Sequence, residues 1–156
     1  MSLLELIELI KTVFTLAIAI SAAIIAWQQL KASRNKLTLD LYDRRLKVYV
    51  ELQKILGQIA LHTDASYEDL SKFKWATAES VFLFQPDIAS YIENVLSHAF
   101  KLRSWNSQYR DFTQSKPAGY DHQRVCDGSA TELQWLITQF EPSREIFKNY
   151  LDLSKI

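Results

Sequence analysis

The sequence predicts an all-α fold, in which a single N-terminal transmembrane helix continues into a cytosolic antiparallel helical bundle. Three observations predict it. An uncharged run extends from Thr12 to Leu30, the 156-residue chain contains only three glycines and three prolines, and apolar residues recur at helical spacing beyond the run. We expect two parts: residues 1–33 as the anchor helix and residues 34–156 as the bundle domain, which is long enough for one core.

The uncharged run fits the hydrocarbon layer of a bilayer. A helix from Thr12 to Leu30 is roughly 28 Å long, and its backbone groups are bonded internally, as hydrocarbon requires. One alternative is a buried core helix, since Thr12, Thr15 and Ser21 dilute the apolar run. Another is a cleaved signal peptide, but Glu5 and acidic neighbours precede the run where basic residues are expected. We therefore predict an uncleaved anchor.

The charges on either side of the run indicate its orientation. Lys11 is the only basic side chain before it, whereas Lys31, Arg34 and Lys36 follow it directly. Lysine and arginine accumulate on the cytoplasmic side. We expect the N-terminus outside and the C-terminal domain in the cytoplasm.

A stripe of small and polar residues runs along one face of the predicted anchor. Membrane helices associate through small residues and interhelical hydrogen bonds, because lipid does not drive apolar faces together. The stripe is therefore a candidate seam for a homo-oligomer or a partner membrane helix, and the alternative is a monomeric anchor rich in alanine. The seam residues inside the run are Thr12, Thr15, Ala19, Ala22 and Ala26.

Capping motifs and prolines divide the rest of the chain. The Ser66–Asp69 and Ser129–Glu132 pairs are typical of helix N-termini, and Pro86 and Pro142 suit a first helical turn. A long loop is expected over residues 113–129. The predicted helices cover residues 2–33, 37–61, 67–84, 87–112, 129–140 and 142–151. The second of them is expected to continue directly from the anchor. In the helix over 67–84, the inward face is predicted to include Leu70, Phe73, Thr77, Ser80, Val81 and Phe84.

Three blocks of the chain, LDLYDRRLKVY, ESVFLFQPDIASYIENV and IFKNYLDL, resemble a loose group of uncharacterised small bacterial inner-membrane proteins. That group has one N-terminal transmembrane helix and a cytosolic helical domain. The resemblance implies the fold and no catalytic residues. The layout alone is also similar to membrane-anchored effectors of bacterial antiviral defence, including those gated by cyclic oligonucleotides.

No established catalytic motif occurs in the sequence. It lacks a phosphate-binding glycine loop and the HExxH, CxxC and GxSxG patterns. The histidines are far apart, and His122 with Cys126 is expected to be a chance pair in a loop. We expect no enzyme activity, no metal and no cofactor. DNA or RNA binding is not expected, because ten basic and thirteen acidic residues follow Gly57.

The most site-like group is basic and aromatic. Cations that bind phosphates and rings that stack on bases would suit a small nucleotide. The alternative is that Trp105 packs in the core and the arginines are solvated. The candidate ligand-binding residues are Arg103, Trp105, Tyr109, Arg110, Lys116 and Arg124.

A structural ion pair is expected between Glu79 and either Arg44 or Arg45. If that pair were buried, removing one partner would cost about 3–5 kcal/mol. A binding-site carboxylate is the alternative role for Glu79.

These features favour a membrane-anchored cytosolic interaction module that self-associates through its transmembrane helix. The alternative function is a ligand-gated membrane effector, whose cytosolic domain senses a small nucleotide and whose helices permeabilise the bilayer. The expected partners are the lipid bilayer and a second copy or partner helix.

Overall fold

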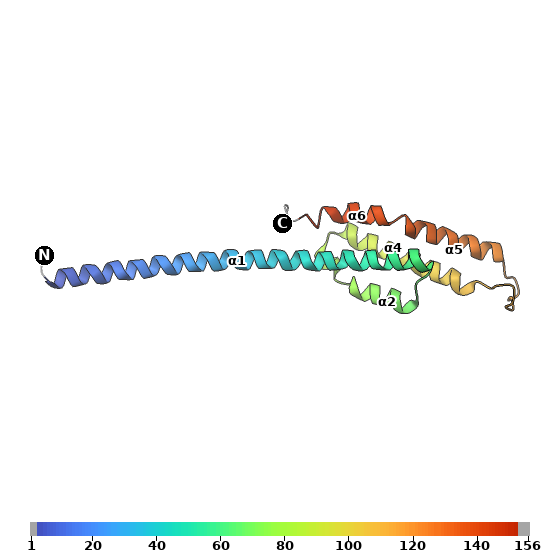
Figure 1. Ribbon diagram of the computed structural model, residues 1–156, viewed down its shortest axis with the longest axis horizontal. Helices are drawn as coiled ribbons and strands as arrows, with labels where there is room; N and C mark the ends of the chain where they lie inside the picture. The colour runs from blue at the N-terminus through green and yellow to red at the C-terminus, as the bar shows by residue number, and fades with distance from the viewer. Residues whose placement is uncertain (1–2, 153–156) are drawn as a thin grey trace. The chain divides into compact units, whose positions relative to one another are not determined.

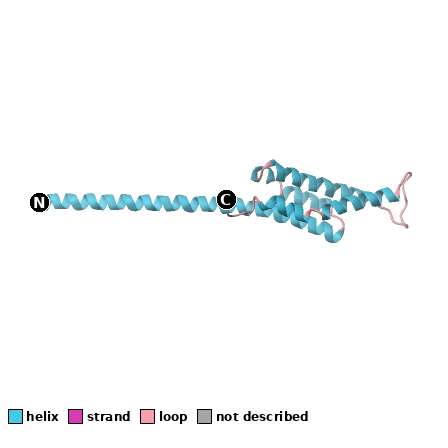
Figure 2. Ribbon diagram, turned by 90° about the horizontal axis from the view of Figure 1, so that it is seen from above, coloured by secondary structure: helices cyan, strands magenta, loops and turns pink. Residues whose placement is uncertain are grey.

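The computed structural model describes residues 3–152. Ser2, the predicted first residue of the anchor helix, lies outside the described residues, as do residues 1 and 153–156. Of the described residues, 81% are helical and none lies in a strand, so the predicted all-α class is confirmed. The helices, coloured in Figure 2, are α1 (Leu3–His62), α2 (Tyr67–Ala76), α3 (Ser80–Leu83), α4 (Pro86–Gln108), α5 (His122–Ile137) and α6 (Phe140–Lys148).

The chain divides into two compact units, Met1–Asp40 and Leu41–Ile156. In the first unit, every residue from 10 to 37 is exposed. An 18-residue window there has a mean hydropathy of 2.0, so by length and composition this part of α1 could cross a membrane. The expected continuation of the N-terminal apolar helix into the helix beginning near Leu37 is confirmed, because α1 is helical from Leu3 to His62 without a break.

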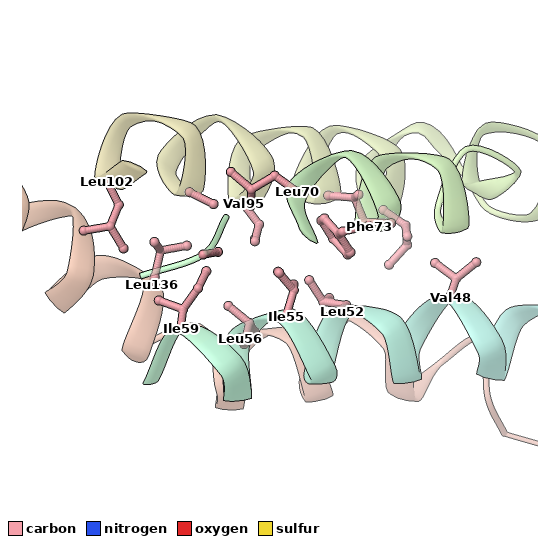
Figure 3. Close-up of a cluster of buried hydrophobic side chains, with 14 of the residues drawn as sticks. Val48, Leu52, Ile55, Leu56, Ile59, Leu70, Phe73, Val95, Leu102 and Leu136 are labelled. Atoms are coloured by element: carbon pink, nitrogen blue, oxygen red, sulfur yellow. The ribbon is translucent and has the colours of Figure 1, made fainter. Parts of the chain in front are cut away.

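The second unit has one apolar core built from five helices. In α1 the buried positions are Val48, Leu52, Ile55, Leu56 and Ile59, which recur at helical spacing. Figure 3 shows these side chains directed toward buried residues of α2, α4 and α5. Phe147 of α6 is also fully buried. The ribbon reverses direction from α1 to α2, from α2 to α4, and from α4 to α5 (Figure 1).

The expected single helix over 67–84 is wrong, because Thr77–Glu79 form a turn that separates α2 from α3. The buried Thr77 hydroxyl donates to the Phe73 carbonyl at 2.9 Å, and the Ser80 N–H bonds to the Thr77 carbonyl. The helical phase therefore restarts at Ser80. Val81, predicted to face inward, is 56% exposed as a result.

The loop between α4 and α5 begins and ends earlier in the chain than predicted. Helix α4 ends at Gln108 rather than Phe112, and α5 begins at His122 rather than after Ser129. The Asp121 carboxylate accepts the Arg124 N–H at 3.0 Å and caps α5 eight residues before the expected cap, Ser129. Residues 122–129 are consequently helical. Pro142 does lie in the first turn of the last helix, as expected, since α6 begins at Phe140.

Candidate functional site

Arg103 is held by the connection between α1 and α2. Its guanidinium lies 2.5 Å from the Asp64 carboxylate and 5.4 Å from the Tyr67 ring centroid. The pair is about one-third exposed, and the Arg103 Nε and one Asp64 oxygen are buried without a hydrogen-bond partner. A carboxylate already neutralises this cation. Arg103 therefore fixes the connection to α4, and it offers a phosphate less than an unpaired arginine would.

Trp105 packs against α5. A Cβ atom added at Gly128 would lie 2.5–2.9 Å from three atoms of the indole ring, so only glycine leaves room for this ring. The next residue, Asn106, donates to the Thr63 carbonyl at 3.1 Å and accepts from the Ser129 hydroxyl at 2.6 Å. These contacts tie α4 to α5 and to the end of α1. The packing role considered for Trp105 matches this geometry.

Arg110 follows the C-terminus of α4 and binds local backbone. Its guanidinium donates to the carbonyls of Ser107 and Tyr109 at 2.9 and 2.8 Å. Carbonyls at a helix C-terminus lack intrahelical partners, and a cation there also complements the helix dipole. Its own N–H donates to the Tyr120 hydroxyl at 3.0 Å. Arg110 thus caps a helix.

Lys116 and Arg124 lie in different surroundings. The Lys116 ammonium is 5.6 and 5.9 Å from the ring centroids of Phe112 and Tyr120. Arg124 is exposed and lines an open hollow of about 580 Å³, together with Trp105 and Gly128. The same hollow is lined by three carboxylates, from Asp121, Asp127 and Glu132. That excess of negative charge disfavours a phosphate there.

The six predicted ligand-binding residues therefore have separate partners: an acidic side chain for Arg103, glycine for Trp105, helix carbonyls for Arg110, rings for Lys116, and an acidic hollow around Arg124. Tyr109 lies 5.6 Å from the His122 ring. Of the four cations, Arg124 alone lines the hollow of about 580 Å³, and none lines the hollow of about 300 Å³ that adjoins Tyr109. The nucleotide site stays a prediction, and this geometry lends it little support.

His122 lies at the centre of a small polar cluster, which includes the pair with Cys126 that we expected to be a chance pair in a loop. The His122 Nδ1 lies 3.2 Å from the Tyr120 hydroxyl, and its Nε2 lies 3.6 Å from the Cys126 sulfur. Because α5 begins at His122, the pair that we expected in a loop lies on adjacent helical turns. Its i,i+4 spacing was visible in the sequence, but the helix start was not. Cys126 also lines a hollow of about 300 Å³ with Asn106 and Ser129.

A second polar contact joins the middle of α4 to α5. The His98 ring stacks on Trp135 with centroids 3.7 Å apart, and its Nδ1 lies 2.5 Å from the Glu132 carboxylate. Both side chains of the pair are largely buried. His98 is thus a structural residue at the edge of the core.

The two arginines of α1 have different roles. Arg44 lies 3.8 Å from Glu79, but both side chains are more than half exposed, so the contribution expected is about 0–1 kcal/mol rather than that of a buried pair. Arg45 instead donates from Nε to the Leu83 carbonyl at 2.9 Å, and its guanidinium lies 5.7 and 5.6 Å from the ring centroids of Phe84 and Tyr150. Arg45 therefore connects α1 to α3 and to the segment after α6.

The seam residues lie in the first unit and are exposed there. The hydroxyls of Thr12 and Thr15 donate to carbonyls four residues earlier, at 2.9 and 2.8 Å. Such bonds satisfy the hydroxyls within the helix. Close packing at Ala19, Ala22 and Ala26 would then carry more of a seam than hydrogen bonding would.

The pKa shifts of the second unit have structural causes. Burial raises the pKa of the Tyr91 phenol to about 12, against a hydrogen bond to Ser143 that lowers it. Burial and the Asp87 carboxylate, 3.0 Å away, raise the pKa of Tyr150. The Ser66 hydroxyl lowers the pKa of Asp69. Among residues 3–152, His, Cys, Asp and Glu form no group of three that could hold a metal ion.

Comparison with known proteins gives no match to a protein family, to a curated protein or to a solved structure. The contacts within the chain are therefore the basis for interpreting its function.

Proposed function

We propose that this chain is a membrane-anchored interaction module, in which a transmembrane helix holds an antiparallel helical bundle at the cytoplasmic face of a bacterial inner membrane. The observation that carries the proposal is the exposure of every residue from 10 to 37 of α1. Water-soluble monomers rarely expose a contiguous apolar surface of this size, whereas lipid covers it at no cost.

The flanking residues support a helix end at the headgroups. Trp27 is 64% exposed, and the Lys31 ammonium lies 5.7 Å from its ring. An amphipathic ring beside a cation suits the membrane–water boundary. The basic residues that follow Leu30 support the orientation with the bundle in the cytoplasm.

The anchor also self-associates in this proposal, through the face that carries Ala19, Ala22 and Ala26. The alternative, a nucleotide-gated effector, receives less support because the cations proposed to bind a nucleotide have separate partners. The interaction module is favoured because polar residues of the second unit bind other parts of the same chain. His98, Arg103 and Arg45 each connect one helix to another segment of this unit.

Anchoring is tested by washing membranes with alkaline carbonate and by fusing alkaline phosphatase to the C-terminus. We expect the wild type to resist the wash and the fusion to be inactive. Replacing Ile20 and Ile24 with arginine should release the chain, since each arginine at the helix centre costs about 2.5–3.5 kcal/mol, whereas leucine at both positions should retain it. A wild-type chain that washes off, or an active fusion, would overturn the proposal or its orientation.

Self-association of the anchor is tested with matched leucine variants. Changing Ala19, Ala22 and Ala26 to leucine should weaken association measured in lipid, because larger side chains keep the backbones apart. Changing Ala17, which lies on the opposite face of the helix, to leucine should have a smaller effect. Equal effects of the two changes would refute the seam.

A further inference from the structure

Helices α2 and α3 expose an apolar surface of the second unit. Trp75 is 80% exposed, Phe82 88% and Val81 56%. We call these three residues the α2–α3 patch. The restart of the helix at Ser80 turns Val81 and Phe82 away from the core. Aromatic residues this exposed contribute nothing to the core, and exposed aromatic side chains are typical of interaction sites.

A hollow of about 320 Å³ adjoins the patch. Its lining combines Trp75, Ala76 and the buried Val48 with the charged side chains of Arg44, Lys47 and Glu79. Glu79 also accepts the Phe82 N–H through its carbonyl at 3.0 Å, so the hollow and the exposed Phe82 are one helical turn apart. The surface therefore presents a protruding ring, a concavity and charges of both signs.

We propose that the α2–α3 patch binds the same patch of a second copy of this chain. In a twofold interface the same surface of both copies is in contact, so that surface must carry both members of each complementary pair. Phe82 of each copy enters the hollow of the other, and Glu79 of each copy approaches Lys47 of the other. Both members of these pairs occur on one surface, which is what a twofold contact requires.

Other occupants fit this surface less well. A bilayer is flat and does not enter a hollow. The lining carries two basic side chains, Arg44 and Lys47, and one carboxylate, Glu79, so a surface with charges of both signs matches it better than an anionic lipid or an acidic peptide. The inference rests on the proposed function, since anchoring in one bilayer raises the effective concentration of two copies.

The test measures energy transfer between copies of the full chain carrying C-terminal donor or acceptor fluorophores, at varied protein-to-lipid ratios in vesicles. Trp75→Ala and Phe82→Ala are each expected to weaken association about tenfold or more, as for central aromatic residues of interfaces. Phe112→Ala is the matched control, because Phe112 is 93% exposed outside the patch. Circular dichroism checks that each variant folds. Equal association of the Phe82 and Phe112 variants would overturn the proposal.

Charge reversal tests the pairing between copies. Glu79→Lys alone and Lys47→Glu alone should each weaken association, because each places like charges across the interface twice. Mixing the two variants should restore association between unlike chains, since opposite charges then meet at both contacts. Mixing without restoration contradicts the twofold arrangement. A contact within one chain does not produce such restoration.

The outcomes separate this inference from the proposed function. Energy transfer that depends only on Ala19, Ala22 and Ala26, or a wild type that is monomeric at every ratio, overturns the patch while an alkaline wash still reports anchoring. A response of Trp75 fluorescence to anionic vesicles without energy transfer assigns the patch to lipid instead. Loss of anchoring in the wash overturns the proposed function itself.

Discussion

Gly57 and Gly128 both lie inside helices, and replacing each with alanine gives a sharp test of the packing between α4 and α5. In an exposed helix, alanine is more favourable than glycine by about 0.8–1 kcal/mol. At Gly57 of α1, a Cβ atom meets nothing within 4 Å. Gly57→Ala should therefore raise the free energy of unfolding by nearly that amount.

At Gly128 the same substitution meets the Trp105 ring, with three indole carbons 2.5–2.9 Å from the added Cβ. The ring is broad and half-buried, so it must move together with its surroundings. Overpacking of this kind costs about 1–3 kcal/mol, which exceeds the gain in helix propensity over most of that range. We expect Gly128→Ala to be destabilised by up to about 2 kcal/mol, and to be less stable than Gly57→Ala by about 1–3 kcal/mol.

The assay is urea unfolding of the full chain in detergent, followed by tryptophan fluorescence and by circular dichroism. The comparison is made between the two variants, because both change the denatured chain in the same way. The double variant Gly128→Ala with Trp105→Leu should recover part of the loss, since the smaller side chain removes the clash. If Gly128→Ala proves as stable as Gly57→Ala, the contact between Trp105 and α5 described above is wrong.

Three further predictions concern polar contacts of the second unit. Glu132→Ala should lower the free energy of unfolding by about 1–3 kcal/mol in urea unfolding, because it leaves the half-buried His98 without its carboxylate; no change would exclude a structural role for the pair. Ser66→Ala should cost about 0.5–2 kcal/mol by removing the α2 cap. The bond from the Ser66 hydroxyl to the Asp69 carboxylate lowers the pKa of Asp69 below 3.8, so this bond stabilises the fold above that pH and weakens as the pH falls through the lowered pKa. The wild type should therefore lose part of its advantage over Ser66→Ala in acid, while the bond from the Asp69 N–H to Ser66 remains. Burial raises the pKa of Tyr91 to about 12 from an ordinary 10.0, so the unfolded chain loses this proton at a lower pH than the folded chain does. The free energy of unfolding should therefore fall above about pH 10, and it should fall less in Tyr91→Phe. A titration of the Tyr91 absorbance near pH 10 in the folded chain would contradict its burial.

The order and type of the helices follow from local signals in the chain. Few glycines and prolines, helical spacing of apolar residues, and the caps at Ser66 and Pro86 predicted α1, the start of α2 and the start of α4. The long apolar run in the first part of α1 was also apparent from the sequence, because mean hydropathy depends only on neighbouring residues. These features depend on residues within a few turns of one another, so the sequence determines them by itself.

Tertiary structure decided the break at Thr77–Glu79 and the partners of the cations. The break allows Arg45 of α1 to reach the Leu83 carbonyl, 38 residues away in sequence, and it exposes Phe82. Arg103 pairs with Asp64 across 39 residues, a contact that no spacing rule indicates. The sequence supplied a list of basic and aromatic residues. Only the folded chain showed that their charges are separately satisfied, because long-range pairing depends on how the helices pack.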